Sequence, residues 1–492
     1  MKKYLLAILS GVIIGLTFRF RVLALLIWVG LIPFLFAFDT KRGRKEAFYL
    51  GWVMGVPLLA IGGYWAIYPL MKFSGFPLII NFIIFLFGAS LLALYFGLFS
   101  FLLSFLEEKF DLHLLILIPV VWTGVEFIRV LISLEFPFFY LAYSQAFIPE
   151  LIQLASYGGV SLVTFLIVLV NTLIFSSIKK KDYRYFLTGA LVFAIIFIQG
   201  FLVLEGEEEI RKSINISLIQ PNFPQELKMD PRKQKEITES LLDQTREELV
   251  NNESDLLIWP ETAILRTYYE DRRLPFNLPT KTPLFIGGFA REGEGRDKVL
   301  NSAFLFDERR LPIERYSKLK LVPFGEYVPF PSLIPDIIQS GMNNLTHGSE
   351  KVEFEINNFS WISPICSEIL NSQLVRSLYS QQDFIVNISN EAWFEESHAP
   401  MQILQAGIFR SVEYRTPLVK VANTGISGIV DSKGRVLVES ALFETWSHTG
   451  KLNIPHRVET PYYKLGNYFG WVNLLIIIGL SLLGIYRERK DR

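Results

Sequence analysis

The chain has 492 residues, 51% of them apolar, and its mean hydropathy is +0.34. A soluble protein of this length averages more polar, so part of the chain is expected to lie in lipid. The formal net charge is zero, which excludes a global basic field that would attract nucleic acid. The single cysteine, Cys366, excludes an intramolecular disulfide, and no two of the five histidines are spaced i, i+4, so a zinc site is not expected. The chain has no GxGxxG or Walker motif, and no organic cofactor is expected.

About eight apolar runs have the composition of membrane-spanning helices, each of which needs roughly 20 mostly apolar residues. These runs are 4–18, 22–38, 47–70, 76–106, 113–132, 160–178, 184–204 and 469–486. They predict a transmembrane helical domain over 1–204, and a last helix with a basic tail over 466–492. The first two runs are short and are expected to form a tilted or re-entrant hairpin. Residues 1–18 also resemble a cleaved signal peptide, but no clear small-residue cleavage motif follows them.

The basic residues near the ends of these runs predict the orientation of the chain in the membrane. With eight spans, the basic clusters at 2–3, 41–45, 179–184 and 487–492 all fall on one side. The opposite short loops carry only Arg19, Arg21 and Lys72 clearly outside a span. Both termini are therefore expected in the cytoplasm, with residues 205–465 on the far side, which in a bacterium is the periplasm.

Residues 205–465 alternate between strand-like and helix-like segments, which predicts a layered α/β domain. Residues 231–250 have helical spacing, with Pro231 in the first turn. The expected strands are 214–220, 256–259, 284–287, 302–306, 384–388, 418–422 and 428–431. A turn over 431–434 (DSKG) ends the last of them.

Three segments of this domain carry residues suited to catalysis. Glu261 follows a strand in LLIWPETAI, Lys318 lies in RYSKLKLVPFGEYVPF, and Cys366 follows a strand in WISPICSEIL. Each has a simpler interpretation alone: a solvated carboxylate, a packed aromatic run, and a small buried hydrophobic residue. Together they supply a thiol nucleophile, a base to take its proton and a cation to hold an oxyanion.

The same segments resemble the nitrilase superfamily of carbon–nitrogen hydrolases, and specifically its apolipoprotein N-acyltransferase branch. The resemblance lies in WPET at 259–262, LVPFGEYVP at 321–329, NISNEAWF at 387–394 and ANTGISG at 422–428. It extends into the apolar part through FPFFYLAYSQ at 136–145 and GVSLVTFLIVLVN at 159–171. The resemblance implies a multi-pass α-helical membrane bundle joined to a nitrilase-like αββα sandwich.

The resemblance also implies roles for individual residues. Glu261 is the general base for Cys366, and Lys318 stabilises the oxyanion, with Lys320 ranked second. Glu326 is implied to line the pocket near the lysine. Further supporting or substrate-binding residues are Ser367, Glu368, Trp393 and Met229.

The chain departs from the family pattern at Met229, Ser367 and Glu395, which stand where the family often has Trp, Tyr and Gly. These departures concern the acyl-chain pocket and leave the triad intact. Residues 136–158 and 328–342 are candidates for loops that gate acyl access, and ordinary packing at the membrane interface explains them equally well.

The activity implied is transfer of a fatty acyl chain from a phospholipid to the N-terminal α-amino group of a diacylglyceryl-cysteine, in the bacterial inner membrane. One alternative is a membrane-anchored amidase that releases acyl groups to water, since it would share the triad. Another is a transporter or non-catalytic scaffold. Transporters place ionisable residues inside spans, and here the main examples are Glu126 and Arg129, which could simply pair with each other at i, i+3.

Overall fold

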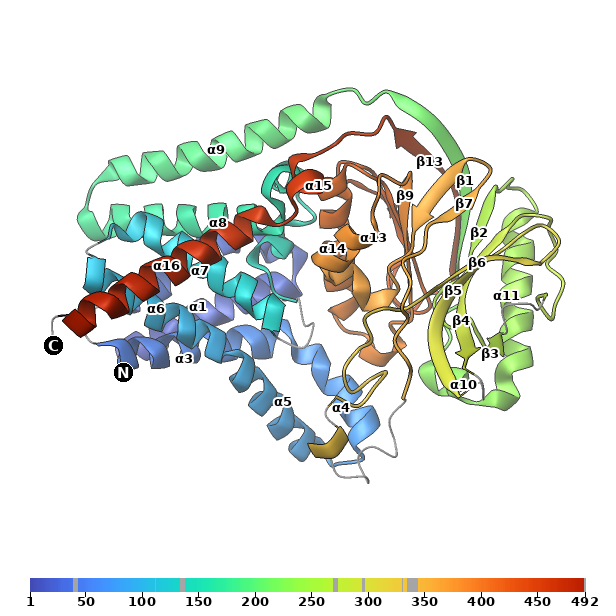
Figure 1. Cartoon of the computed structure of the whole chain (residues 1–492), viewed down its shortest axis with the longest axis horizontal. Coiled ribbons are helices and arrows are strands. Elements are labelled where there is room, and N and C mark those ends of the chain that lie inside the picture. Colours follow the sequence, from blue (N-terminus) through green and yellow to red (C-terminus); the bar gives the residue numbers. More distant parts are fainter. Residues whose placement is uncertain are drawn as a thin grey trace. The chain divides into compact units, whose positions relative to one another are not determined.

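The structure is a computed structural model that describes residues 1–38, 43–110, 112–132, 138–268, 273–293, 297–329, 331–333 and 344–490. The chain divides into two compact units (Figure 1). The helical unit comprises Met1–Met71, Gly75–Gly206 and Thr460–Arg492, and the α/β unit comprises Lys72–Ser74 and Glu207–Glu459. The α/β unit is thus an insertion in the helical one, along the chain.

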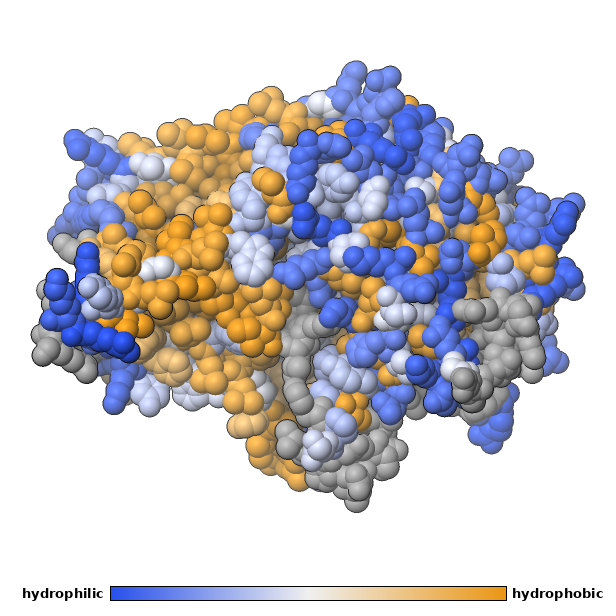
Figure 2. All heavy atoms as spheres, viewed as in Figure 1, coloured by the Kyte–Doolittle hydropathy of each residue, from blue (hydrophilic) through white to orange (hydrophobic). Residues whose placement is uncertain are grey.

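Within the described residues, the helical unit contains five helices that are long and apolar enough to cross a membrane. They are the continuous segment Leu78–Phe110 (α5 and α6), α7 (Leu114–Ile132), α8 (Ala155–Lys180), α9 (Tyr183–Glu205) and α16 (Tyr468–Lys490). Apolar side chains cover the visible face of this unit, as expected for a surface that meets lipid (Figure 2). The predicted multi-pass helical bundle is therefore confirmed.

The remaining apolar runs form shorter or broken helices. Run 47–70 is α3 (Arg44–Gly62) followed by η3 (Tyr64–Ala66) and α4 (Ile67–Ser74), with a 66° bend at the break. Counted as one span, this bent pair raises the number of candidate spans among the described residues to six. Run 4–18 is α1 (Lys2–Arg19), and run 22–38 is a 3-10 segment, η1 (Arg21–Trp28), followed by α2 (Ile32–Ala37). The count of eight spans stays a prediction.

Small residues let the helices of this unit approach closely, which is how membrane helices gain packing energy without a hydrophobic effect. A Cβ on Gly51 of α3 would lie 2.1 Å from the Phe96 carbonyl oxygen of α6. A Cβ on Gly200 of α9 would lie 1.8 Å from the Glu150 carbonyl oxygen. Both positions therefore require glycine.

The α/β unit is built from two sheets. The first has the order β13-β1-β2-β4-β5-β6, with β3 paired to β4, and the second has the order β12-β11-β10-β9-β8-β7. The first sheet comprises β1 (Ile210–Gln220), β2 (Leu256–Ile258), β3 (Ile264–Tyr268), β4 (Leu284–Glu292), β5 (Lys298–Phe306), β6 (Pro312–Ser317) and β13 (Trp446–Pro455). The second comprises β7 (Phe354–Ile356), β8 (Phe359–Ile362), β9 (Phe384–Ser389), β10 (Leu418–Ala422), β11 (Gly428–Val430) and β12 (Val436–Glu439).

The two sheets pack face to face and carry helices on their outer faces. Between them, the ring of Phe285 on β4 lies 5.6 Å from Trp361 on β8 and 4.9 Å from Phe354 on β7. Helix α11 (Gln234–Leu249) lies on one side of the strands, and α13 (Ser372–Leu378) with α14 (Ala399–Tyr414) on the other (Figure 1). Ile237 and Leu241 of α11 join the apolar core of the first sheet. The predicted two-sheet α/β sandwich is confirmed.

Candidate active site

Cys366 begins η8 (Cys366–Leu370), four residues after β8 ends at Ile362. Its φ angle is +52°, a left-handed conformation that is rare for a residue with a side chain and costs about 1–3 kcal/mol. The surrounding structure holds this turn in place, because Asn387 Nδ2 donates to the carbonyl oxygens of Pro364 at 2.7 Å and Cys366 at 3.1 Å. The side chain is buried, and the strained turn fixes the direction of the thiol.

Glu261 lies in the turn that follows β2. A Cβ at Gly287 would lie 2.5 Å from the Glu261 Cα, so only glycine lets this turn pack against β4. The Glu261 carboxylate accepts from Asn301 Nδ2 at 2.6 Å and from the Asn390 backbone N–H at 2.6 Å. Both carboxylate oxygens are therefore held in fixed positions.

Lys318 directly follows β6 and is 1% exposed. Its Nζ lies 2.9 Å from the carboxylate of Glu326 and 3.6 Å from Oε1 of Glu261. Burial lowers the pKa of Lys318, but the charges of Glu326 and Glu261 more than reverse this, so the net pKa is raised. The ammonium therefore remains a permanent positive charge, as an oxyanion-stabilising group must.

The thiol is strongly held in its protonated form. Burial and the charge of Glu261 raise the pKa of Cys366 to about 12, although Lys318 and a hydrogen bond from Ser389 act in the opposite direction. A thiolate is the nucleophilic form of cysteine. A nucleophilic role for this thiol would therefore require a base that takes its proton, and Glu261 is a carboxylate whose charge acts on the thiol.

Glu368 links the lysine segment to the cysteine turn. Its Oε1 accepts from the backbone N–H groups of Leu319 at 2.8 Å and Lys320 at 2.9 Å, and its Oε2 accepts from Ile365 N at 2.8 Å. The Tyr316 hydroxyl donates to the same carboxylate at 3.0 Å. Burial raises the pKa of Glu368 to about 7, against the charge of Lys318 and these donors.

The structure thus brings together Glu261, Lys318, Cys366, Glu326 and Glu368. Of the other residues expected from the sequence, Ser367 is the second residue of η8, and Trp393 is half-buried in η9 (Ala392–Phe394). Met229 ends α10 (Gln225–Met229), but its side chain lies outside what the structure describes. Lys320 is exposed and contributes its backbone N–H to Glu368.

The structure adds residues that sequence reasoning missed. Asn301 donates from one Nδ2 to both Glu261 and Glu326, at 2.6 and 2.8 Å. Lys228 is 2% exposed, and its Nζ donates to the Glu261 carbonyl oxygen at 3.2 Å and to Thr262 Oγ1 at 2.8 Å. Burial lowers the pKa of Lys228 to about 7, against the charges of Glu261 and Cys366. In the sequence, the one signal that pointed to Lys228 was its position beside Met229, which had been compared with a Trp of the family.

The structure describes most of one candidate gating loop, 136–158, and little of the other, 328–342. Most of 136–158 is described and forms η4 (Leu141–Gln145), η5 (Pro149–Leu151) and the start of α8, with largely buried side chains. The loop 328–342 lies mostly outside the described residues. No group of three or more His, Cys, Asp or Glu side chains able to hold a metal occurs in the described part of the chain.

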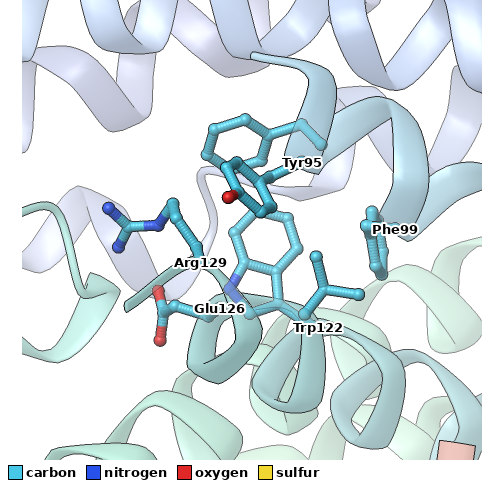
Figure 3. A pocket seen from close by; sticks show the side chains of 7 residues that line it. Tyr95, Phe99, Trp122, Glu126 and Arg129 are labelled. Carbon is cyan, nitrogen blue, oxygen red and sulfur yellow. The ribbon is translucent and has the colours of Figure 1, made fainter. Parts of the chain in front are cut away.

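Glu126 and Arg129 of α7 line a small pocket in the helical unit together with Tyr95, Phe99 and Trp122 (Figure 3). Glu126 Oε1 accepts from the Leu141 backbone N–H at 3.0 Å. Arg129 donates to the carbonyl oxygen of Phe138. Both ionisable side chains therefore bind backbone groups, at Phe138 and Leu141.

Comparison with models of known protein families identifies the class of each of the two units. A family model described as carbon-nitrogen hydrolase matches residues 216–453, which agrees with the two-sheet α/β unit. A second model, described as the apolipoprotein N-acyltransferase N-terminal domain, matches residues 10–173 of the helical unit.

Relatives along the whole chain then identify the family. An apolipoprotein N-acyltransferase of Geobacter metallireducens is 32% identical over 487 residues, covering 96% of this chain and 93% of the relative. Those of Haemophilus influenzae and Pasteurella multocida are 30% and 28% identical, covering 99% and 98% of this chain and 96% and 94% of their own lengths. The chain belongs to the apolipoprotein N-acyltransferase family, and it is an acyltransferase.

Proposed function

We propose that the protein moves a fatty acyl chain from a phospholipid to the N-terminal α-amino group of a diacylglyceryl-cysteine, through a thioester on Cys366. The main support for this proposal is a buried cluster of three side chains. In it Lys318 Nζ lies 3.6 Å from Glu261 Oε1, and both charges act on the Cys366 thiol. In a family of acyltransferases, a thiol with a base and a fixed cation is suited to covalent acyl transfer.

In the first step, Glu261 takes the proton of Cys366 as Sγ attacks the ester carbonyl carbon of the phospholipid. A C–S bond forms and the carbonyl electron pair moves to oxygen, where the Lys318 ammonium stabilises the charge, aided by a backbone N–H near the nucleophile. The ester C–O bond then breaks. Glu261 returns its proton to the lysophospholipid oxygen, and a thioester remains.

In the second step, the acceptor amine attacks the thioester carbonyl while Glu261 takes a proton from the nitrogen. The C–S bond breaks, an amide forms, and the leaving thiolate recovers a proton from Glu261. The two steps together form a ping-pong cycle that consumes no cofactor. Glu326, Asn301 and Glu368 act as positioning residues, because they bind Lys318, Glu261 and the turn before Cys366.

The helical unit supports this assignment, because both substrates are lipids. Removing a fatty chain from the membrane costs about 0.8 kcal/mol for each CH₂ exposed to water. A catalytic unit inserted between α9 and α16 is tethered to the membrane at both of its ends, so the substrates need not leave the bilayer.

We place the protein in the bacterial inner membrane, with both termini in the cytoplasm and the α/β unit in the periplasm. Ion pairs between separate helices support the proposal that both ends of the chain lie on the same side of the membrane. Arg44 binds Glu108 of α6 at 3.0 Å and Glu488 of α16 at 3.4 Å. Lys3 of α1 pairs with Glu46 of α3. In Figure 1 the start of α1 and the end of α16 lie at the same end of the helical unit.

Labelled phospholipid provides the test of this function. Purified protein in detergent, given phospholipid with a labelled fatty chain, is expected to form a hydroxylamine-sensitive adduct that then transfers to a diacylated lipopeptide. Cys366→Ala should abolish the adduct, and Glu261→Gln should slow its formation by at least roughly a hundredfold. Lys235→Met, on the exposed face of α11, is the matched control and should leave the adduct unchanged.

The alternatives predict other outcomes. An adduct that decays only to free fatty acid would identify the amidase-like hydrolase. An adduct that persists in Cys366→Ala, or no adduct from folded protein, would contradict the thioester mechanism and favour a binding scaffold.

A further inference from the structure

The hydroxyl group of Ser389 lies between two acceptors. Ser389 ends β9 and is fully buried, and its Oγ lies 3.5 Å from the Sγ of Cys366 and 2.8 Å from Oε1 of Glu391. A serine hydroxyl carries a single proton, so it donates to only one of these acceptors at a time. The choice between them must therefore depend on which acceptor is more strongly negative.

A buried ion pair accompanies this hydroxyl. Lys420 on β10 lies with its Nζ 2.6 Å from Oε1 of Glu391, and it also donates to the Ile426 carbonyl oxygen at 2.9 Å. The two side chains of the pair are 1% and 0% exposed. A buried ion pair contributes little net stability compared with apolar packing, so its contact with the Ser389 hydroxyl calls for another explanation.

The charge on sulfur decides the direction of the hydroxyl. A neutral thiol is a weak acceptor and a carboxylate a strong one, so in the resting protein Ser389 donates to Glu391. Once Cys366 becomes a thiolate, sulfur carries a full negative charge and competes for the same proton. Glu391 keeps its bond to Lys420 when the hydroxyl turns away, so its charge is never left unpaired.

We propose that Ser389 is a further catalytic residue, a hydrogen-bond donor that turns from Glu391 to Cys366 whenever the sulfur is anionic. The inference rests on the proposed function, in which sulfur is a thiolate twice in each cycle. It is anionic first as the attacking nucleophile and again as the group that leaves when the amide forms. In the thioester between these steps sulfur is neutral, and the hydroxyl returns to Glu391. The Glu391–Lys420 pair serves as the alternative partner that holds the hydroxyl in reach.

The only cysteine of the chain makes this proposal directly measurable. The rate of Cys366 alkylation by iodoacetamide follows the thiolate fraction, and it requires neither lipid nor acyl transfer. Ser389→Ala should lower this rate about 10- to 100-fold at each pH below the thiol pKa, the effect of one hydrogen bond to a charged group. Glu261, Lys318 and Glu391, whose charges act on this thiol, remain in place, and Ser389→Thr, which keeps a hydroxyl, should recover most of the rate.

Ser363→Ala is the matched control, because Ser363 is also buried, lies three residues before Cys366 and has an Oγ with no partner among the described residues. It should alkylate like the unaltered protein. A Ser389→Ala rate within twofold of the unaltered protein, or an equal fall in Ser363→Ala, would overturn the proposal. Failure of the unaltered protein to form a lipid adduct would contradict the proposed function and leave the alkylation result standing.

Discussion

Lys228 is a buried lysine beside Glu261, the proposed general base, and no carboxylate of a described residue lies within ion-pair distance of it. Its Nζ holds the Glu261 carbonyl oxygen and Thr262 Oγ1. Thr262 has φ +48°, so this clamp secures a strained turn. Lys228→Met removes the charge but keeps the length. Because a buried charge costs free energy, this variant is expected to be more stable by about 1–4 kcal/mol below pH 7, after the loss of two hydrogen bonds. Adduct formation should nevertheless fall roughly tenfold as Glu261 loses its fixed position.

The pH dependence of stability checks the same residue. The pKa of Lys228 is about 7 in the folded protein, because burial lowers it from the ordinary lysine value of 10.5. Between these values the unfolded chain binds more protons, so the stability of the unaltered protein rises with pH through this window. The stability advantage of Lys228→Met should therefore be largest below pH 7 and shrink towards pH 10.5, as thermal unfolding in detergent would show. A stability advantage of Lys228→Met that does not change with pH would contradict a buried charge on Lys228.

Glu395 adopts φ +47° and ψ −161°, a conformation that is essentially restricted to glycine. The family often has Gly at this position, so the departure noted in the sequence carries a structural penalty. Glu395→Gly should be more stable than Glu395→Ala by about 1 kcal/mol or more, because both variants lose the carboxylate but only glycine relieves the strain. Equal unfolding midpoints for the two variants would show that the backbone there is not strained.

At the scale of residues, the sequence predicted the groups that we propose to take part in bond making, and it missed several side chains that contact them. Glu261, Lys318 and Cys366 each follow a strand, where working residues are expected in α/β folds. Ser389 and Lys228 were missed because a serine in NISNEAWF or a lysine in QELKMDP has no pattern that reveals its hydrogen-bond partner. Their contacts arise only from tertiary packing.

At the scale of elements, the site depends on the close approach of β4 to the turn after β2. A Cβ at Gly287 would lie 2.5 Å from the Glu261 Cα and 2.7 Å from the Thr262 nitrogen, both backbone atoms. Gly287→Ala should displace the turn and lower adduct formation about a hundredfold. Gly479→Ala in α16, where no atom lies within 4 Å of the added Cβ, is the control and should retain full activity.

The Glu368 carboxylate joins the segment after β6 to the turn before η8. All of its partners are donors, so a Gln amide nitrogen there would face another donor. Glu368→Gln should destabilise the protein by about 1–3 kcal/mol and lower adduct formation. Tyr316→Phe removes one donor and leaves the backbone bonds, so it should have the smaller effect in both assays. The reverse order would contradict the clamp.

Elements differed in how well their sequences revealed them. Strands such as β9 and β10 are short, fully buried apolar runs and were predicted. Strand β13 was missed because half-buried residues dominate it and its apolar alternation is weak. The break between α3 and α4 was also missed, since run 47–70 is continuously apolar and hydropathy carries no information on a bend of 66°.

At the scale of the whole molecule, the orientation in the membrane can be tested with reporters. A fluorescent protein that matures only in the cytoplasm, fused after Arg492, should be bright, and a phosphatase active only in the periplasm should be inactive there. The same phosphatase, fused after Glu253 in the exposed turn between α11 and β2, should be active. A periplasmic C-terminus would contradict the alternation of basic clusters from which the orientation was inferred.

The pairing of β1 with β13 has a consequence for biosynthesis. These strands are antiparallel neighbours, with Ile214 opposite Leu452, yet more than 200 residues of chain separate them. If the α/β unit is periplasmic, as proposed, β1 crosses the membrane first and keeps an open edge until almost the entire unit has followed it. Folding of the first sheet is completed only as α16 becomes available for insertion, so a ribosome that stalls before residue 446 leaves an unpaired strand for proteases and chaperones to find.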